Sequence, residues 1–183
     1  MLETERCILK LLSESEALFV YEFYYSNKDI FDPWEPKKVK NYYTIPYIKA
    51  ILNAERRLRL QGKLIRWFVF DKSNLDKIIG TVCFNHINIL PFKGCQIGYK
   101  FDRDYHGLGY AYEATLKSIE YMFSHYELYE IEASVSPNNK SSIALLSKLG
   151  FNDKGLPLIP IEISGVLTEH KKYILTHNTK ELL

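Results

Sequence analysis

The stretch that decides the fold is Tyr105-His106-Gly107-Leu108-Gly109-Tyr110-Ala111-Tyr112-Glu113-Ala114. It follows a strand-like run that ends near Phe101, and it sets two glycines and an alanine at the start of a predicted helix. Small residues at a helix start leave backbone N–H groups open at the positive end of the helix dipole. Such a loop can hold a phosphate or pyrophosphate through main-chain donors alone. The stretch therefore predicts a ligand that carries phosphate.

Length and composition bound the class of protein. The 183 residues, 46% of them apolar and 14% aromatic, predict one folded domain over residues 1–183. A net charge of +2 is too small to indicate direct nucleic-acid binding. Without a signal-peptide pattern or an apolar run of ~20 residues, we expect a cytoplasmic protein with no membrane segment. Three scattered cysteines predict reduced thiols and no metal site.

Apolar periodicity and turn residues predict a mixed α/β order of elements. Strand-like runs cover residues 5–12, 64–71, 78–90, 95–102 and 130–136, with two short strands around Ser164-Gly165 in the tail. Helices are predicted after Ser13 and from Thr44, Gly109 and Pro137. Short connections favour antiparallel neighbours, but the long helical crossover between 95–102 and 130–136 makes those two strands parallel.

Two further features are predicted from the sequence. The closely spaced prolines of Asp32-Pro33-Trp34-Glu35-Pro36 predict a loop, because neither fits a helix interior. A local basic cluster indicates a solvated helix face, and its members are Arg56, Arg57, Arg59, Lys63 and Arg66.

The glycine spacing matches one of three phosphate loops. The dinucleotide pattern G-x-G-x-x-G/A fails because Ala111 falls one place early, and the Gly-Lys-Ser/Thr ending of a Walker A loop is absent. The run from His106 to Ala111 resembles the [Q/R]-x-x-G-x-[G/A] loop of the GNAT N-acetyltransferase superfamily, with His106 at the Gln/Arg position. Pro137-Asn138-Asn139-Lys140-Ser141-Ser142 and Lys148-Leu149-Gly150-Phe151 resemble the N-x-x-S and K-x-G-F elements of the same superfamily.

The resemblance narrows to the RimJ/RimL branch. It is carried further by Pro33-Trp34-Glu35-Pro36, Tyr42-Tyr43-Thr44, Ile97-Gly98-Tyr99 and Glu169-His170. The tail departs from the branch at Pro160, where Tyr is usual, and at Leu167, where Trp is usual. The implied fold is a mostly antiparallel central sheet, splayed at a parallel strand pair and flanked by about four helices. The implied activity is acetyl transfer from acetyl-CoA to a primary amine.

The resemblance also implies which residues would hold acetyl-CoA. The loop amides would bind the pyrophosphate, and the backbone after Gly98 would pair with the pantetheine arm. Asn139 would hydrogen-bond the pantetheine amides or cap the helix that follows it. The cofactor-binding candidates are Tyr99, Lys100, Phe101, His106, Gly107, Leu108, Gly109, Tyr110, Ala111, Asn139 and Ser142.

Three side chains are candidates for proton transfer. Ser142, the serine of N-x-x-S, would hydrogen-bond the leaving thiolate or relay a proton, or would complete a helix cap. His86 is placed on a predicted strand and is a candidate general base, because free histidine has a pKa of ~6.5, although a lone histidine on a strand is more often structural than catalytic. Glu113 could act as the base, favour the helix dipole or hold a neighbouring loop. Trp34 and Asn85 are candidates for binding the acceptor.

Three functions stay open on these grounds, for a monomer or a homodimer. The first is direct acetylation of the N-terminal amino group of a ribosomal or other protein. The second is acetylation of a small amine such as a polyamine, an amino acid or an antibiotic, which a narrow acidic pocket would favour over an open groove. The third is a catalytically silent CoA-binding module, which His106 at the Gln/Arg position motivates.

Overall fold

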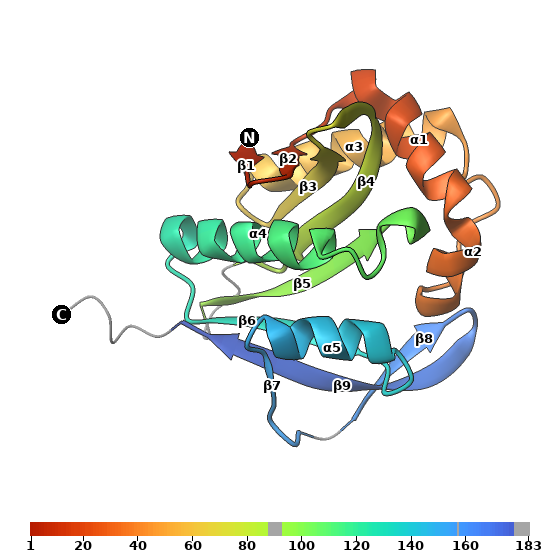
Figure 1. Cartoon of the computed structure of the whole chain (residues 1–183). Helices are drawn as coiled ribbons and strands as arrows, with labels where there is room; N and C mark the ends of the chain where they lie inside the picture. The colour runs from red at the N-terminus through yellow and green to blue at the C-terminus, as the bar shows by residue number, and fades with distance from the viewer. Residues whose placement is uncertain (88–92, 157, 178–183) are drawn as a thin grey trace.

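A central sheet with helices on both faces forms the body of the molecule (Figure 1). The structure is a computed structural model, and it describes residues 1–87, 93–156 and 158–177. The strands are β1 (Leu2–Glu3), β2 (Cys7–Lys10), β3 (Leu64–Asp71), β4 (Asn74–Asn85), β5 (Gly94–Phe101), β6 (Glu130–Val135), β7 (Asn152–Asp153), β8 (Ile159–Ile163) and β9 (Val166–Thr176). The α-helices are α1 (Ala17–Ser26), α2 (Lys28–Phe31), α3 (Ile45–Leu60), α4 (Tyr110–Tyr126) and α5 (Lys140–Lys148). Three short 3₁₀ turns cover Glu14–Glu16, Asp32–Trp34 and Arg103–Tyr105.

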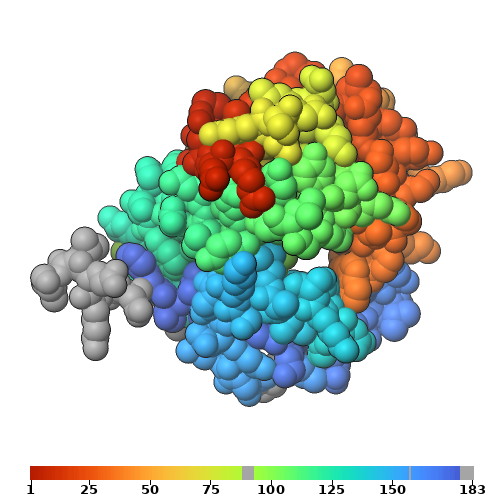
Figure 2. Space-filling view, viewed as in Figure 1, coloured from red at the N-terminus to blue at the C-terminus, as the bar shows by residue number. Residues whose placement is uncertain are grey.

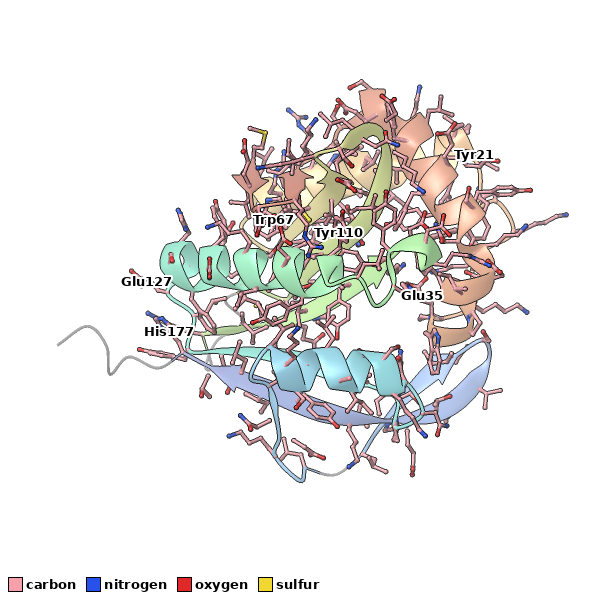
Figure 3. All side chains as sticks on the ribbon, viewed as in Figure 1. Tyr21, Glu35, Trp67, Tyr110, Glu127 and His177 are labelled. Atoms are coloured by element: carbon pink, nitrogen blue, oxygen red, sulfur yellow. The ribbon has the colours of Figure 1, made fainter. Side chains whose placement is uncertain are left out.

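The alternation of side chains along β3 builds the two layers. Phe68 and Phe70 pack in one cluster with Val20 of α1 and Leu52 of α3. Trp67 points to the opposite face, where its ring meets Tyr121 of α4 edge-on at 5.1 Å (Figure 3). Because successive strand residues face opposite sides, a strand buried on both faces carries apolar residues at nearly every position.

The strand pairing in the sheet changes from antiparallel to parallel between β5 and β6. Its order is β1-β2-β3-β4-β5-β6-β9-β7, with β8 paired to β9 beside this path. All described pairs are antiparallel except β5 with β6, which confirms the predicted parallel pair and the mostly antiparallel sheet. The β5–β6 ladder covers only Gly94–Gln96 against Glu130–Glu132. Beyond it, β6 stays paired with β9 while β5 stays paired with β4, so the two halves of the sheet separate.

The strand predicted over residues 78–90 has different bounds. β4 begins at Asn74, which pairs with Asp71, so Asn74 and Asp76 were wrongly placed in a connection. The actual connection is a two-residue turn in which Asp71 Oδ1 accepts hydrogen bonds from the Ser73 backbone N–H at 2.9 Å and its hydroxyl at 2.8 Å. At the other end β4 stops at Asn85. Residues 88–90 of the predicted strand lie outside the described residues.

The helix count and two short strands also differ from expectation. The described chain has five α-helices instead of about four, because α2 follows α1 directly after Asn27. The predicted proline loop begins with the 3₁₀ turn Asp32–Trp34. Pro33 lies in the first positions of this turn, where a backbone N–H has no acceptor within the turn, so proline loses no hydrogen bond there. The first predicted strand is shorter and forms a hairpin with β1. The tail hairpin around Ser164-Gly165 is confirmed as β8 and β9, whereas β7 was not predicted.

Other features of the described residues bear on the predicted class. Cys7, Cys83 and Cys95 are free and buried, which confirms the reduced-thiol interpretation. No helix in the described ranges is long and apolar enough to cross a membrane. Over the same ranges, no group of three or more His, Cys, Asp or Glu residues is arranged to hold a metal ion.

Gly80 of β4 and Gly98 of β5 offer a matched test of how closely the β4 backbone packs against Phe101. A methyl group on Gly80 would lie 2.4 Å from the Phe101 ring and 3.0 Å from the Lys100 carbonyl oxygen, whereas one on Gly98 would meet nothing within 4 Å. We expect Gly80→Ala to lower the free energy of unfolding in urea by about 1–3 kcal/mol. Gly98→Ala should change it by less than about 0.5 kcal/mol. Equal losses in the two variants would contradict this packing.

Candidate active site

A cavity of about 710 Å³ lies where β5 and β6 separate. Its walls come from both faces of the sheet, since they include residues of α2 and the turn after it as well as the loop before α4 and the start of α5. Residues of β5 and β6 beyond the paired segment line its middle. The cavity therefore passes through the sheet at the divergence. In Figure 2, the green surface of β5 and α4 lies above the cyan surface of α5 on either side of this divergence.

The loop before α4 supplies backbone donors to the cavity. His106 Nε2 lies 2.9 Å from the Phe101 carbonyl oxygen and ties the loop to the end of β5. Gly107 and Gly109 have φ of +74° and +88°, a left-handed conformation that glycine adopts without steric cost. Gly107, Gly109 and Ala111 line the cavity, and the first N–H groups of a helix lack intrahelical acceptors. The positive end of α4 thus faces the cavity in the manner that a pyrophosphate requires.

The start of α5 lies across the cavity from β5. Asn139 Oδ1 accepts hydrogen bonds from the Ser142 backbone N–H at 3.1 Å and the Ser141 hydroxyl at 3.0 Å, so the capping role of Asn139 is confirmed. The Ser142 hydroxyl is 2.8 Å from the Tyr99 hydroxyl. Burial raises the pKa of Tyr99 to about 12, although the hydrogen bond to Ser142 opposes the rise. The two hydroxyls form one pair that joins β5 to α5.

The other mouth of the cavity carries ion pairs. Glu35, labelled in Figure 3, lies between the ammonium groups of Lys38 and Lys100. Burial lowers the pKa of Lys100 to about 8, although Glu35 opposes the shift. Burial raises the pKa of Glu35, but Lys100 and Lys38 outweigh it, and the net pKa lies below its usual value. Arg66, whose side chain is 19% exposed, pairs with Glu55 of α3 at 2.9 Å.

Two polar atoms in the wall have no acceptor or donor within the described chain. They are Thr81 Oγ1 and Asn85 Oδ1, both inaccessible to solvent and both on residues that line the cavity. Thr81 pairs with Lys100 across the β4–β5 ladder, so it faces the same side of the sheet as the ion pairs. Buried polar atoms are nearly always hydrogen-bonded in folded proteins. Thr81 Oγ1 and Asn85 Oδ1 make this part of the wall polar beneath its accessible surface.

His170 of β9 is a further cavity residue. It is 7% exposed, and its Nδ1 lies 2.8 Å from the Thr168 carbonyl oxygen. A carbonyl can only accept a hydrogen bond, so Nδ1 carries the proton and Nε2 is the nitrogen left to receive one. This is the arrangement that a general base needs.

The structure brings most of the predicted site residues together. Those that line the cavity are Trp34, Asn85, Tyr99, Lys100, Phe101, His106, Gly107, Gly109, Ala111, Asn139 and Ser142. Leu108 and Tyr110 belong to the same loop, but they are absent from the lining. The Leu108 side chain is exposed, and the Tyr110 hydroxyl donates to Asp71 at 2.8 Å.

Two of the proton-transfer candidates lie elsewhere. His86 was placed on a strand, but it follows β4 at a φ of +50°, and its Nδ1 lies 3.0 Å from Gln96 outside the cavity lining. The Glu113 carboxylate bonds Thr4 and Arg6 of the N-terminal segment, also outside the lining. Neither position offers contact with a molecule in the cavity.

Several cavity residues were not singled out as site residues from the sequence. The solvated-face interpretation was wrong for Arg66, because it belongs to β3 and not to the helix that carries the other arginines. A charge between Ile65 and Trp67 in an apolar strand was the available signal. His170 was noted only as part of a branch motif. Glu35 was also noted only as part of a branch motif, and its lysine partner on β5 is distant in sequence.

Comparisons with known proteins agree with this geometry. The Acetyltransferase (GNAT) domain family matches residues 6–152. The chain is 28% identical to the ribosomal protein uS5-alanine N-acetyltransferase of Escherichia coli (strain K12), over 96% of this chain and 90% of that protein. The crystal structure of ribosomal-protein-S5-alanine acetyltransferase from Vibrio fischeri superposes with a TM-score of 0.89 at 28% identity, over 97% of both chains. RimJ of Mycobacterium smegmatis, solved in complex with CoA-disulfide, shares the fold at 21% identity with a TM-score of 0.83, over 98% of this chain and 88% of that one.

The family match covers β4, β5, the glycine loop, α4 and α5, all of which contribute residues to the cavity wall. The divergent parallel pair and the mostly antiparallel sheet are the features that the resemblance predicted for the fold. The chain belongs to the GNAT acetyltransferase family, in its RimJ/RimL branch, and is an N-acetyltransferase.

Proposed function

We propose that this enzyme transfers the acetyl group of acetyl-CoA to the N-terminal α-amino group of a protein, with a ribosomal protein as the nearest candidate. The observation that carries the proposal is the cavity that crosses the sheet. On one side it meets the phosphate-binding loop, and on the other it opens into a polar region lined by Glu35, Arg66 and Lys100, which we call the chamber. The names of the relatives support the proposal, since the Escherichia coli protein is a ribosomal protein uS5-alanine N-acetyltransferase.

The residues present fit acetyl-CoA on the side of α4 and α5. The loop amides from Gly107 to Ala111 would hold the pyrophosphate. In the described chain, β6 pairs with β5 only as far as Gln96, so the backbone from Ile97 to Phe101 faces the cavity without a partner strand on that side. An extended pantetheine arm carries amides that can pair with such an edge. The CoA-disulfide named in the Mycobacterium smegmatis RimJ structure supports the same donor.

The charges in the chamber argue against a polyamine as acceptor. Among the described lining residues, Glu35 is the carboxylate, whereas the cations are Arg66, Lys100 and Lys148. The Glu35 charge is already matched by Lys38 and Lys100. A diamine would bring a second cation towards these groups and would be repelled. A protein N-terminus brings a single amine and therefore one cation fewer than a diamine.

Direct transfer needs a proton acceptor for the amine and a donor for the thiolate. His170 Nε2 would take the proton that the amine loses as its nitrogen bonds the acetyl carbon. When the carbon–sulfur bond breaks, the Ser142 hydroxyl, which contacts the Tyr99 hydroxyl, would hydrogen-bond the sulfur and relay to it a proton from water. Cys83 also lines the cavity, but burial raises the pKa of its thiol, which disfavours an acetyl-cysteine route.

We infer that residues 1–183 form a single domain. The GNAT match ends at residue 152, but β9 pairs with β6 from Glu130 to Val135 and contributes His170 to the cavity. The tail is therefore part of the same core. A ribosomal protein as acceptor would place the enzyme in the cytoplasm.

The acceptor class can be tested by measuring thiol release from acetyl-CoA. We expect turnover with peptides that begin with Ala or Ser, and turnover with spermidine lower by at least about tenfold. A peptide with a blocked N-terminus and a free lysine should be inactive, because the chamber would bind the α-amine. Preferred turnover of spermidine would overturn the acceptor assignment. CoA binding without turnover of any acceptor would overturn the transfer itself.

The role of His170 can be tested against that of His86 with the same substitution. His170→Asn keeps a side-chain N–H for the Thr168 carbonyl but removes the base. We expect kcat/KM to fall by about 10²–10⁴-fold, with CoA affinity unchanged. His86→Asn, outside the cavity lining and at a positive φ that Asn tolerates, should leave both unchanged. A large loss of kcat/KM in His86→Asn, with none in His170→Asn, would reverse the assignment.

Lys100 should make the choice of acceptor depend on pH. With its pKa lowered to about 8, Lys100 is charged below pH 8 and becomes neutral as the pH rises through that value. Peptides that begin with Lys should therefore be disfavoured against Ala-first peptides by roughly tenfold at about pH 7, and by less at about pH 9. In Lys100→Met the preference should be small at both pH values. Glu35 keeps Lys38 as its partner in that variant.

The control for Lys100→Met is Lys117→Met, which removes an exposed lysine of α4 paired with Glu120. It should keep the wild-type ratio of kcat/KM for the two peptides at each pH. An unchanged ratio in Lys100→Met would show that Lys100 takes no part in selecting the acceptor.

A further inference from the structure

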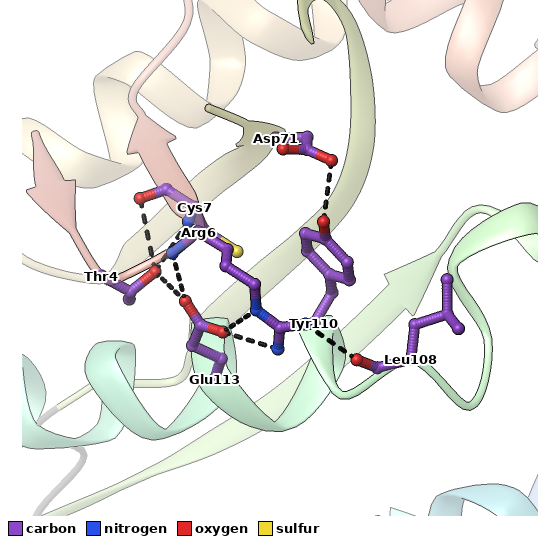
Figure 4. Close-up of polar contacts among 7 residues, drawn as sticks. All are labelled: Thr4, Arg6, Cys7, Asp71, Leu108, Tyr110 and Glu113. Atoms are coloured by element: carbon purple, nitrogen blue, oxygen red, sulfur yellow. Dashed lines mark hydrogen bonds and ion pairs between the residues drawn. The ribbon is translucent and has the colours of Figure 1, made fainter. Parts of the chain in front are cut away.

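The N-terminal strand pair brings one arginine to the pyrophosphate loop. Arg6, between β1 and β2, reaches the start of α4 (Figure 4). Its Nη1 donates to the Leu108 carbonyl oxygen at 3.0 Å, and its guanidinium lies over the Tyr110 ring at 4.4 Å from the ring centre. A methyl group on Gly109 would come within 3.2 Å of Arg6 Nη2. Arg6 thus contacts Leu108 and Tyr110 and lies beside Gly109 between them.

The bond to Leu108 has a geometric consequence for the loop. The peptide unit between Leu108 and Gly109 is planar, and in the trans form its C=O and N–H point in opposite directions. Because the Leu108 carbonyl points to Arg6, the Gly109 N–H is directed away from Arg6. Gly109 lines the cavity, whereas Arg6 is outside its lining. The same bond therefore turns one loop amide towards the place of the pyrophosphate.

Without the bond from Arg6, few contacts in the loop would fix the orientation of the Leu108–Gly109 peptide unit. Gly107 and Gly109 both have a positive φ and flank Leu108. The Leu108–Gly109 peptide unit rotates about ψ of Leu108 and φ of Gly109, and glycine has access to a wider range of φ than any other residue, so the Gly109 side offers little resistance to rotation. A donor outside the loop is needed to keep one orientation before the ligand binds.

Glu113 holds Arg6 in place. Its Oε2 accepts from Arg6 Nε and pairs with Nη2, each at 2.7 Å, and its Oε1 accepts from the Arg6 backbone N–H at 2.7 Å. Thr4 donates its hydroxyl to the same Oε1 at 2.5 Å. Burial raises the pKa of Glu113, but the bonds from Thr4 and Arg6 outweigh it and keep the pKa below its usual value. With Nε and Nη2 committed to the carboxylate, the planar fork aims Nη1 at the loop.

We propose that Arg6 is a positioning residue for the pyrophosphate loop, and that Glu113 and Thr4 aim its guanidinium so that the Gly109 amide faces the donor. The proposal rests on acetyl-CoA as the donor in the proposed function. Glu113 then acts through Arg6 and not on the acceptor amine. The N-terminal segment, far from the loop in sequence, becomes part of the donor site.

The test compares three variants by calorimetric titration with CoA. Arg6→Lys keeps the charge but lacks the fork, so it cannot bond Glu113 and the Leu108 carbonyl together. We expect its Kd for CoA to rise about tenfold. Glu113→Gln should raise Kd by a similar factor, because its amide group would face the guanidinium donors. The double variant should be no weaker than either single variant, since both remove one interaction.

Two further measurements separate positioning from a merely structural role. For turnover of an Ala-first peptide, Arg6→Lys should raise KM for acetyl-CoA with little change in kcat. With S-acetylpantetheine, which lacks the pyrophosphate, kcat/KM should equal that of the wild type. Arg57→Lys is the matched control, because Arg57 is an exposed arginine of α3 that bonds Asn53 away from the loop. It should leave every value unchanged.

Each contrary outcome has a distinct meaning. A wild-type Kd for CoA in Arg6→Lys would show that charge alone acts, or that Arg6 takes no part, and would overturn the proposal. A lower melting temperature of the unliganded variant with unchanged Kd would assign Arg6 and Glu113 to stability alone. An equal loss of kcat/KM with S-acetylpantetheine would also contradict positioning at the pyrophosphate. Failure of the wild type to bind CoA would overturn the donor assignment itself.

Discussion

The separation of β5 from β6 after a short parallel ladder is the constraint on which the site depends. Only Gly94–Gln96 pairs with Glu130–Glu132, and each strand then stays with its other neighbour. An unpaired strand edge inside a protein leaves N–H and C=O groups that need partners. Here the edge borders a cavity that a cofactor arm of extended shape can enter. The same separation lets one cavity reach both faces of the sheet, so a donor on one face could meet an acceptor that enters from the other.

The groups around this opening are held by contacts between distant segments. Tyr99 of β5 and Ser142 of α5 pair their hydroxyls across it. Glu35, from the segment after α2, meets Lys100 of β5 at the other mouth. Such partly buried charges are costly unless they are paired, so their retention next to a cavity points to use by a bound molecule. Positioning of the donor loop by Arg6 follows the same pattern, with the partner supplied by the N-terminal strand pair.

Local patterns predicted much of the fold, and the errors have local causes. The glycine loop, the helix after it and the parallel strand were correct, because helix starts and crossover lengths are read from short segments. The start of β4 was missed because Asp71 and Ser73 close a turn through a side chain rather than through glycine or proline. The strand assignment of His86 was wrong because the residue has a positive φ, which the identity of its side chain does not predict.

By itself, the sequence determined the glycine loop and the helix cap on one side of the cavity. The conformation of the loop from His106 to Ala111 and the cap at Asn139 depend on neighbouring residues. Both can therefore be predicted from the spacing of residues in the sequence. The tertiary structure alone decided the partners of the ionisable groups. Glu113 bonds Arg6, which lies 107 residues away, and His170 reaches the cavity only because β9 pairs with β6. Long-range partners come from strand order and register, which no short stretch of sequence encodes, and they set the roles of the remaining side chains.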